Sequence, residues 1–413
     1  MSTTTRQYDF ILLGATGYTG QLTATHIFKN LPLDLNWAVA GRNSSKLQSL
    51  VTELQKFNPD RAPPSIEVND FSKPNLETLV AKARVVITTV GPFHLHGTPI
   101  IEACARAGTH YLDSTGETPW VYDVTHKYHS LARDNGTILI PHCAQESAPA
   151  DLVAFLLTSA IREKTGRGTK QLVHSIQKFE NDMSGGTLRS LISVAESYPF
   201  RHLKESVKPY ALCDDKVTPR DEPFRPKGYA WKGSATIKGL GRLSDSVIGI
   251  PDTNLVYRSW SLMKEDYGSE FRYWTGMTTK GAVSGFFWHW MMALSLPMLL
   301  VAPLRWIMLK LVPAHGDGPS EESQSKSSTV WKSIAHSEAD PKITAVCDMS
   351  FDRDMYSLTA ITLSEAAMVL LRPDRENPAQ KIGGGVLTPA TLGYQYVERV
   401  RAAGLKVQVK IEE

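Results

Sequence analysis

The stretch "FILLGATGYTGQL", residues 10–22, joins an apolar run to three regularly spaced glycines. The run predicts a buried parallel strand, and the glycines follow at G-x-x-G-x-x-G spacing before a helical pattern that begins near Gln21. Such a turn lets the backbone approach a pyrophosphate, whose charge the helix N-terminus favours. A turn with only a structural role is the alternative. We predict that the dinucleotide is bound by Gly14, Ala15, Thr16, Gly17, Tyr18, Thr19 and Gly20.

The next predicted strand lies in "NWAVAGRNSSKL", residues 36–47, and indicates which nucleotide is bound. A protein that prefers NAD places Asp or Glu at the end of this strand, where it binds the ribose 2′-hydroxyl. Here Arg42 stands at that end, and Lys46 follows one turn along the next helix. Both cations suit a 2′-phosphate, so we predict NADP(H) as the cofactor. The alternative is that they form an ordinary solvated helix start.

Strand and helix patterns alternate as far as residue 143, which predicts a doubly wound parallel Rossmann-type sheet. Ligands of such sheets lie at the carboxyl ends of the strands. Asp70 ends the strand predicted at 65–70 and is expected beside the adenine. Gly91 and Pro92, in the strand predicted at 84–93, are expected near the nicotinamide. Glu117 follows the next strand and either faces the reactive ring or belongs to a cap and turn.

Length and composition restrict the class of protein. A chain of 413 residues suggests two domains, and a net charge of +3 lacks the concentrated basic face of a nucleic-acid binder. The four cysteines are widely spaced, and the N-terminal "MSTTTRQYDF" has no apolar signal region. We therefore expect reduced thiols and a protein that is not secreted.

Two other chemistries find little support in the sequence. A short-chain dehydrogenase uses a Tyr followed four residues later by Lys, and none of the fourteen tyrosines has this spacing. His94 and His96 in "FHLHG" suggest a metal site, but no acidic or cysteine ligands stand nearby to complete it. We expect no metal, and we interpret the two histidines as loop residues beside the cofactor.

Several segments together resemble a known family. They are "GATGYTGQL", "AGRNSSKL", "GPFHLHGTPIIEACARAGTHYLDSTGE", "SAPADL", "SGGTLRS", "DYGSEFRY" and "GGGVLTPATLG". In this order they resemble the saccharopine dehydrogenase-like oxidoreductases, which include the trans-acting enoyl reductases of lipid and polyketide assembly. The resemblance implies a dinucleotide-binding domain over 1–148, an inserted α+β domain for substrate or dimerisation over 149–380, and a return to the first domain over 381–413.

The resemblance also implies an activity, the NADPH-dependent reduction of a C=C bond in an acyl or polyketide intermediate, free or carrier-bound. An acid must then protonate the α-carbon. The candidates in matched segments are Glu117, Ser147, Ser184 and Tyr356, each of which could instead be a cap, a turn or a core hydroxyl. Two segments depart from the family pattern, "HCAQESAPAD" at 142–151 and "FDRDMYSLTA" at 351–360.

Two alternatives to enoyl reduction stay open. The chain could reduce an imine or a ketone instead. It could also bind the nucleotide without turnover and serve as a lipid-surface or scaffold protein, because a fold does not prove an activity.

The segment "GAVSGFFWHWMMALSLPMLLVAPL", residues 281–304, contains no Asp, Glu, Lys or Arg. It is long enough to span a bilayer, but Pro297 and Pro303 interrupt it, and tryptophans and basic residues flank it. A transmembrane span and a buried core helix are two interpretations. We favour a third, an interfacial anchor over 281–313 that holds the protein on the cytoplasmic face of a membrane or lipid droplet.

Overall fold

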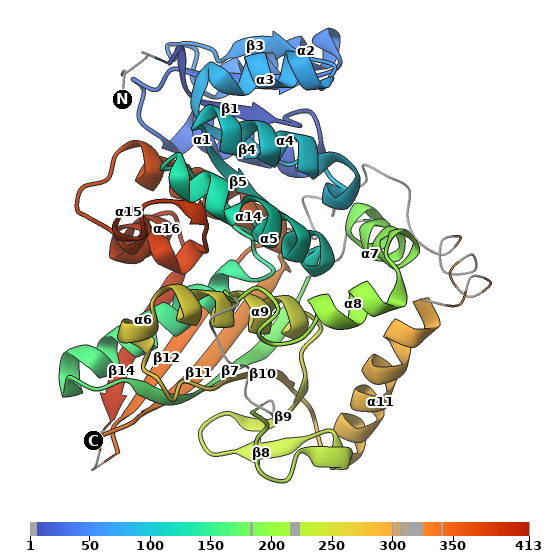
Figure 1. Ribbon diagram of the computed structural model, residues 1–413, viewed down its shortest axis with the longest axis vertical. Coiled ribbons are helices and arrows are strands. Elements are labelled where there is room, and N and C mark those ends of the chain that lie inside the picture. Colours follow the sequence, from blue (N-terminus) through green and yellow to red (C-terminus); the bar gives the residue numbers. More distant parts are fainter. Residues whose placement is uncertain are drawn as a thin grey trace. The chain divides into compact units, whose positions relative to one another are not determined.

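The computed structural model describes residues 6–181, 185–214, 224–299, 301, 303, 305, 310, 324, 326–339 and 342–412 (Figure 1). The chain forms two compact units. The first consists of Met1–Gln145 and Tyr356–Ala403, and the second of Glu146–Met355 and Gly404–Glu413. Each unit is built on its own seven-stranded sheet.

The first unit contains a parallel sheet in the order β13-β6-β5-β4-β1-β2-β3. From β1 the sheet first grows through β2 and β3 on one side and then through β4, β5 and β6 on the other, so right-handed crossovers place helices on both faces. Because both faces are covered, the central strands are apolar throughout, which confirms the predicted sheet class. The strands are β1 (Tyr8–Leu13), β2 (Trp37–Gly41), β3 (Ser65–Val68), β4 (Ala83–Thr88), β5 (His110–Asp113), β6 (Ile138–Ile140) and β13 (Gly385–Val386).

The helices of the first unit come from both of its chain segments. Before the insertion they are α1 (Tyr18–Asn30), α2 (Ser44–Phe57), α3 (Lys73–Ala81), α4 (Phe93–Ala107) and α5 (Thr118–Asp134). After it they are α14 (Met355–Leu371), α15 (Pro378–Ile382), the 3₁₀ helix η2 (Pro389–Leu392) and α16 (Gly393–Ala402).

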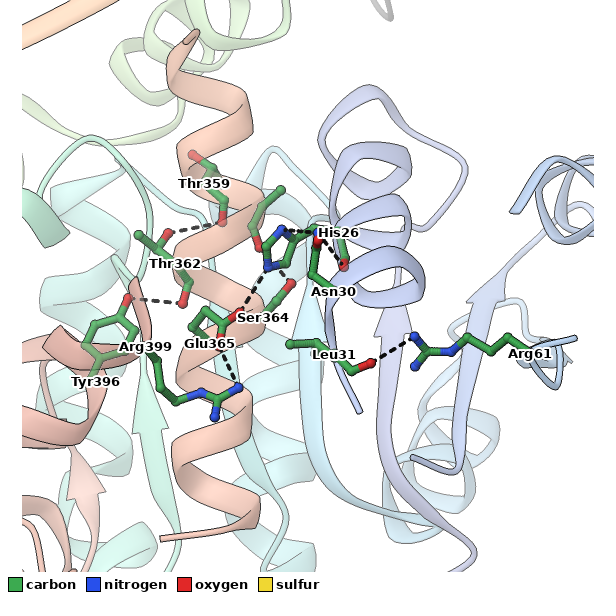
Figure 2. Close-up of polar contacts among 11 residues, drawn as sticks. His26, Asn30, Leu31, Arg61, Thr359, Thr362, Ser364, Glu365, Tyr396 and Arg399 are labelled. Carbon is green, nitrogen blue, oxygen red and sulfur yellow. Dashed lines mark hydrogen bonds and ion pairs between the residues drawn. The ribbon is translucent and has the colours of Figure 1, made fainter. Parts of the chain in front are cut away.

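A buried carboxylate ties the returning segment to the first helix of the chain. Glu365 of α14 lies between His26 of α1, at 3.0 Å, and Arg399 of α16, at 2.7 Å (Figure 2). On the same helix the hydroxyl of Thr362 donates to the carbonyl of Thr359, and the Thr362 carbonyl accepts from Tyr396. These contacts place α14 within the first unit.

The second unit is a mixed α+β structure, as expected. Its sheet runs in the order β14-β12-β11-β7-β10-β9-β8, and among its neighbours only β7 and β10 are parallel in the described residues. The strands are β7 (Thr169–Glu180), β8 (Ala235–Ile237), β9 (Gly241–Asp245), β10 (Tyr273–Thr278), β11 (Ser328–Ser337), β12 (Thr344–Phe351) and β14 (Lys406–Glu412).

Helices of the second unit precede, separate and follow these strands. They are α6 (Ala148–Thr165), α7 (Gly185–Ser197), α8 (Phe200–Ser206), the 3₁₀ helix η1 (Ala230–Lys232), α9 (Gly249–Leu262), α10 (Lys264–Tyr267) and α11 (Ala282–Leu299). Helix α11 contains most of the charge-free stretch, whose remainder lies largely outside the described residues. In the part of the chain that the structure describes, no helix is both long enough and apolar enough to cross a membrane.

The boundaries of the two units differ from the expected ones in two places. The return to the first unit begins at Tyr356 and not at residue 381, because α14 already packs with α1. Residues 404–413 join the second unit, where β14 pairs with β12 in antiparallel register. The last strand of the chain therefore completes the second sheet and not the first.

Candidate active site

The polar residues of the first unit gather where its parallel strands end. The chain leaves β4 in contact with the glycine turn after β1: the backbone N–H of Thr89 donates to the Leu13 carbonyl at 3.1 Å, and its hydroxyl donates to the Gly14 carbonyl at 3.2 Å. The turns that follow β1 and β4 are therefore neighbours. This is the place where dinucleotides bind to sheets of this topology.

The glycine turn has the geometry of a phosphate cradle. Gly14 has a φ of +77°, which side chains other than glycine rarely adopt. A Cβ on Gly20 would lie 2.2 Å from the Gly14 carbonyl oxygen. Gly17 is the N-cap of α1, where it has no side chain to cap the first N–H groups. The residues present thus fit a pyrophosphate at the start of α1.

The turn after β2 leaves its basic side chains exposed. Arg42 follows β2 directly, and Lys46 stands in the first turn of α2, where its backbone N–H is capped by the Asn43 side chain at 2.9 Å. In the described ranges no ion pair involves Arg42 or Lys46. Both cations are available to a 2′-phosphate.

The remaining predicted cofactor residues lie in the turns after β3 and β4. Asp70 is exposed, and its Oδ1 accepts bonds from the backbone and hydroxyl of Ser72 and from the Asn75 amide. It therefore organises the turn into α3. Pro92 is the N-cap of α4, and Gly91 precedes it on the surface. The strand predicted at 84–93 is shorter than expected, because α4 already begins at Phe93.

Glu117, a predicted catalytic residue, joins the turn after β5 to the start of α4. Its two carboxylate oxygens accept bonds from the backbone N–H groups of Phe93, at 2.9 Å, and His94, at 2.7 Å. The same carboxylate contacts Nδ1 of His94 at 2.6 Å, and both side chains are buried. Glu117 therefore caps the N-terminus of α4 with its side chain. A capping role was one of the two interpretations of this residue. Glu117 also fixes the ring of a histidine at the edge where the nicotinamide is expected.

Asp113 and His142 form a second pair in this region, and their contact was not predicted. Asp113, at the end of β5, accepts bonds from the Tyr111 hydroxyl and from the backbone N–H groups of Thr115 and His142. Burial raises the pKa of Asp113 to about 7. His142 has a φ of +59°, and its Nδ1 lies 2.6 Å from the Thr115 carbonyl. Burial lowers the pKa of His142 to about 4, so this ring is neutral at physiological pH.

Tyr356 is brought to the nucleotide turn. Its ring packs edge-on against Tyr18, the first residue of α1, with the ring centroids 5.3 Å apart. This contact lies within the first unit. Tyr356 therefore lies beside the glycine turn, where its ring supports the cofactor loop.

The two predicted serines lie elsewhere. Ser147 is buried in the second unit as the N-cap of α6, but its side chain makes no capping bond there. Burial and the charge of Glu146 raise the pKa of the buried Asp252. The Ser147 hydroxyl acts in the opposite direction and lowers this pKa. Ser184 lies outside the described residues.

A parallel sheet with a glycine cradle after β1 and a basic turn after β2 defines a dinucleotide-binding oxidoreductase fold. Comparisons with known proteins show what the chain is similar to. Residues 10–140 match the saccharopine dehydrogenase NADP-binding domain, which confirms the predicted cofactor NADP(H).

Two relatives are similar to this chain over nearly its whole length. A protein of Mycobacterium tuberculosis named trans-acting enoyl reductase is 29% identical over 426 residues, which cover 98% of each chain. Its namesake from Mycobacterium ulcerans is 28% identical over 431 residues, with coverage of 98% of this chain and 99% of the relative. Among solved structures, apo saccharopine dehydrogenase from Saccharomyces cerevisiae matches with a TM-score of 0.52 and 12% identity, over 98% of this chain and 100% of that one. This last match shows a shared fold.

Proposed function

We propose that the protein is an NADPH-dependent enoyl reductase that acts on an acyl or polyketide thioester. The observation that carries the proposal is the relation to trans-acting enoyl reductases along the whole of both chains, inserted unit included. The geometry of the first unit adds a histidine, held by a carboxylate, at the expected nicotinamide edge. A carrier-bound substrate is part of the proposal, because the named relatives act in trans.

The cofactor supplies a hydride to the β-carbon of the substrate, and the electrons of the C=C bond then form an enolate at the α-carbon. We assign the proton that completes the reaction to His94. With Nδ1 protonated and donating to Glu117, the ring would present the transferred proton at Nε2. The products would be the saturated thioester and the oxidised cofactor.

Glu117 is better suited to hold His94 than to donate a proton itself. Its two oxygens already accept two backbone bonds and the histidine contact. A carboxylate at the start of a helix is also stabilised by the helix dipole. In this proposal His94 carries the proton, and Glu117 orients the His94 ring.

The test is reduction by the full-length protein of an enoyl thioester on an acyl carrier protein, with an imine and a ketone as competing substrates. With NADPH deuterated on the transferred position, we expect one deuterium at the β-carbon of the product and one solvent proton at the α-carbon. If NADPH were consumed with the imine or the ketone but not with the enoyl thioester, the substrate would be of that class instead. Cofactor binding with no turnover of any of the three would favour a scaffold protein.

A further inference from the structure

Helix α11 carries an uninterrupted apolar face that is open to solvent. Its large exposed side chains recur at the spacing of one helical face over the 18 residues of the helix, a length of about 27 Å. Phe287 is 66% exposed and Leu294 is 55% exposed. Among the described side chains of α11, the large exposed apolar ones are Val283, Phe287, Trp290, Met291, Leu294 and Met298.

The opposite face of α11 is held by polar contacts. Asp245, at the end of β9, contacts Nδ1 of His289 at 2.5 Å with its carboxylate and accepts a bond from the Trp288 indole at 2.8 Å with its carbonyl. The hydroxyl of Ser244 donates to the Gly285 carbonyl at 3.1 Å. These contacts fix the rotation of the helix about its axis. The apolar face is therefore held on the side that is exposed to solvent.

The far end of the helix is held as well. Leu299 is buried in a small apolar cluster with Ile192 and Ala195 of α7. Arg305, beyond the helix, bonds to the Leu299 carbonyl at 3.0 Å and to Glu196 at 3.1 Å. Both ends of α11 thus contact other elements of the second unit, in which the helix is drawn in orange (Figure 1).

Charge distribution favours one occupant for this face. Residues 281–304 carry no Asp, Glu, Lys or Arg, while the exposed Lys280 precedes the helix and the exposed Lys310 follows it. Of the acidic groups that contact this segment, Asp245 contacts His289 and Glu196 pairs with Arg305. An apolar face with aromatic side chains and basic residues at its two ends is complementary to anionic phospholipid.

We propose that the outward face of α11 lies in the plane of an anionic membrane leaflet and binds the protein to that surface. The helix inserts its apolar side chains at the boundary of headgroups and acyl chains, and its inner face stays bonded to β9. This inference is independent of the reaction that the first unit catalyses.

The experiment is flotation of the full-length protein with phosphatidylcholine vesicles, with and without phosphatidylserine. We expect flotation that increases with phosphatidylserine and decreases with salt. The double variant Phe287→Glu, Leu294→Glu should lose at least about tenfold in vesicle affinity, because two charges would enter the apolar boundary. The matched control is Phe57→Glu, since Phe57 is 51% exposed on α2 of the other unit. The control should float like the unchanged protein.

Three results would overturn the proposal. One is the absence of flotation with either vesicle, and another is undiminished flotation of the double variant. The third is a dimer in sedimentation that dissociates in the double variant without any vesicle binding, because a second copy of the chain would then cover the face. Circular dichroism and retained NADPH binding establish that the double variant is folded.

A labelling measurement gives an independent readout. The four native cysteines are all buried, so Met291→Cys provides a selective site for an environment-sensitive fluorophore on the exposed face. We expect a blue shift on addition of anionic vesicles, and no shift for the same label at Phe57→Cys. Equal responses at the two sites would contradict an oriented interaction.

Discussion

The carboxylate of Glu117 contacts Nδ1 of His94 at 2.6 Å and accepts the backbone N–H of the same residue at 2.7 Å. One side chain therefore fixes both the ring and the backbone of a residue 23 positions earlier in the sequence. A histidine held at two points has a defined orientation relative to the sheet edge. Such preorganisation is what a proton donor needs.

Replacement of His94 tests its assignment as the proton donor. His94→Gln keeps an N–H group for Glu117 but removes the titratable ring, so kcat should fall by about 10²- to 10⁴-fold while the dissociation constant for NADPH stays unchanged. The measurements are single-turnover kinetics and calorimetric titration. His96→Gln is the control, because His96 is exposed on the same helix. Equal rates in both variants would exclude His94 from proton transfer.

Arg42 is expected to set the preference for NADP(H). Arg42→Asp replaces a guanidinium that can bind a 2′-phosphate by a carboxylate that repels it, and charge-assisted bonds of this kind contribute about 1.5 to 3 kcal/mol. We expect NADPH affinity to fall by roughly ten- to a hundredfold, and NADH to be preferred. Arg353→Asp makes the same charge change at an exposed position of the second unit. Unaltered NADPH binding in Arg42→Asp would show that Arg42 does not bind the 2′-phosphate.

Two glycines of the cradle should respond differently to substitution. Gly17 has φ −79° and ψ 165°, which a branched residue adopts without strain, and a Cβ there would lie 3.4 Å from the Gly14 carbonyl. Gly17→Val should therefore fold normally and lose NADPH binding, because its side chain would occupy the space of the pyrophosphate. Gly20→Ala should lose stability too, since its Cβ would lie 2.2 Å from the same oxygen. Thermal melts with cofactor titrations distinguish them, and a Gly17→Val protein that binds normally would reduce the cradle to a turn.

The raised pKa of Asp113 makes a prediction about pH. Its folded pKa of about 7 lies above the ordinary value of 3.8, so the folded state binds the extra proton between these values. The contribution of Asp113 to the free energy of unfolding is fully present below about pH 4, and it is lost as the pH rises to about 7. His142, whose pKa is lowered to about 4, has the opposite effect. The loss should therefore be read from the difference between the native protein and Asp113→Asn.

Urea unfolding at a series of pH values measures this difference. The unfolding free energy of the native protein relative to Asp113→Asn should fall by up to about 4 kcal/mol between about pH 4 and pH 7. Thr137→Val, another buried polar position of the first unit, gives the response of a site without a titratable group. A difference that does not vary with pH would show that Asp113 has an ordinary pKa.

The first sheet was predictable because its signals are local. A strand covered on both faces is a continuous apolar run, and the glycine turn and Arg42 follow such runs directly in the sequence. In contrast, α9 lies in a stretch where no clean periodicity stands out. It begins at Gly249 with a proline two residues later and buries polar side chains such as Asp252, so its helical periodicity is obscured.

The pairing of distant residues was harder to predict. The pattern of Lys406–Glu412 alternates as a strand should, but no local signal tells which sheet it joins. His94 was seen as a loop residue beside the cofactor, and its partner Glu117 as a separate candidate. Their contact depends on the turn after β5 meeting the start of α4, which sequence periodicity does not encode. The roles of the candidate residues in catalysis stay predictions.

Each of the two sheets gains an edge strand from residues 385–412. Gly385–Val386 adds β13 to β6 in the first sheet, and Lys406–Glu412 adds β14 to β12 in the second. During synthesis on the ribosome, β6 and β12 therefore lack these neighbours until residues 385–412 have been made. Strands without a neighbour on one side can pair with other chains. Truncation just before residue 385 would leave β6 and β12 each unpaired on one side, and we expect the truncated chain to aggregate.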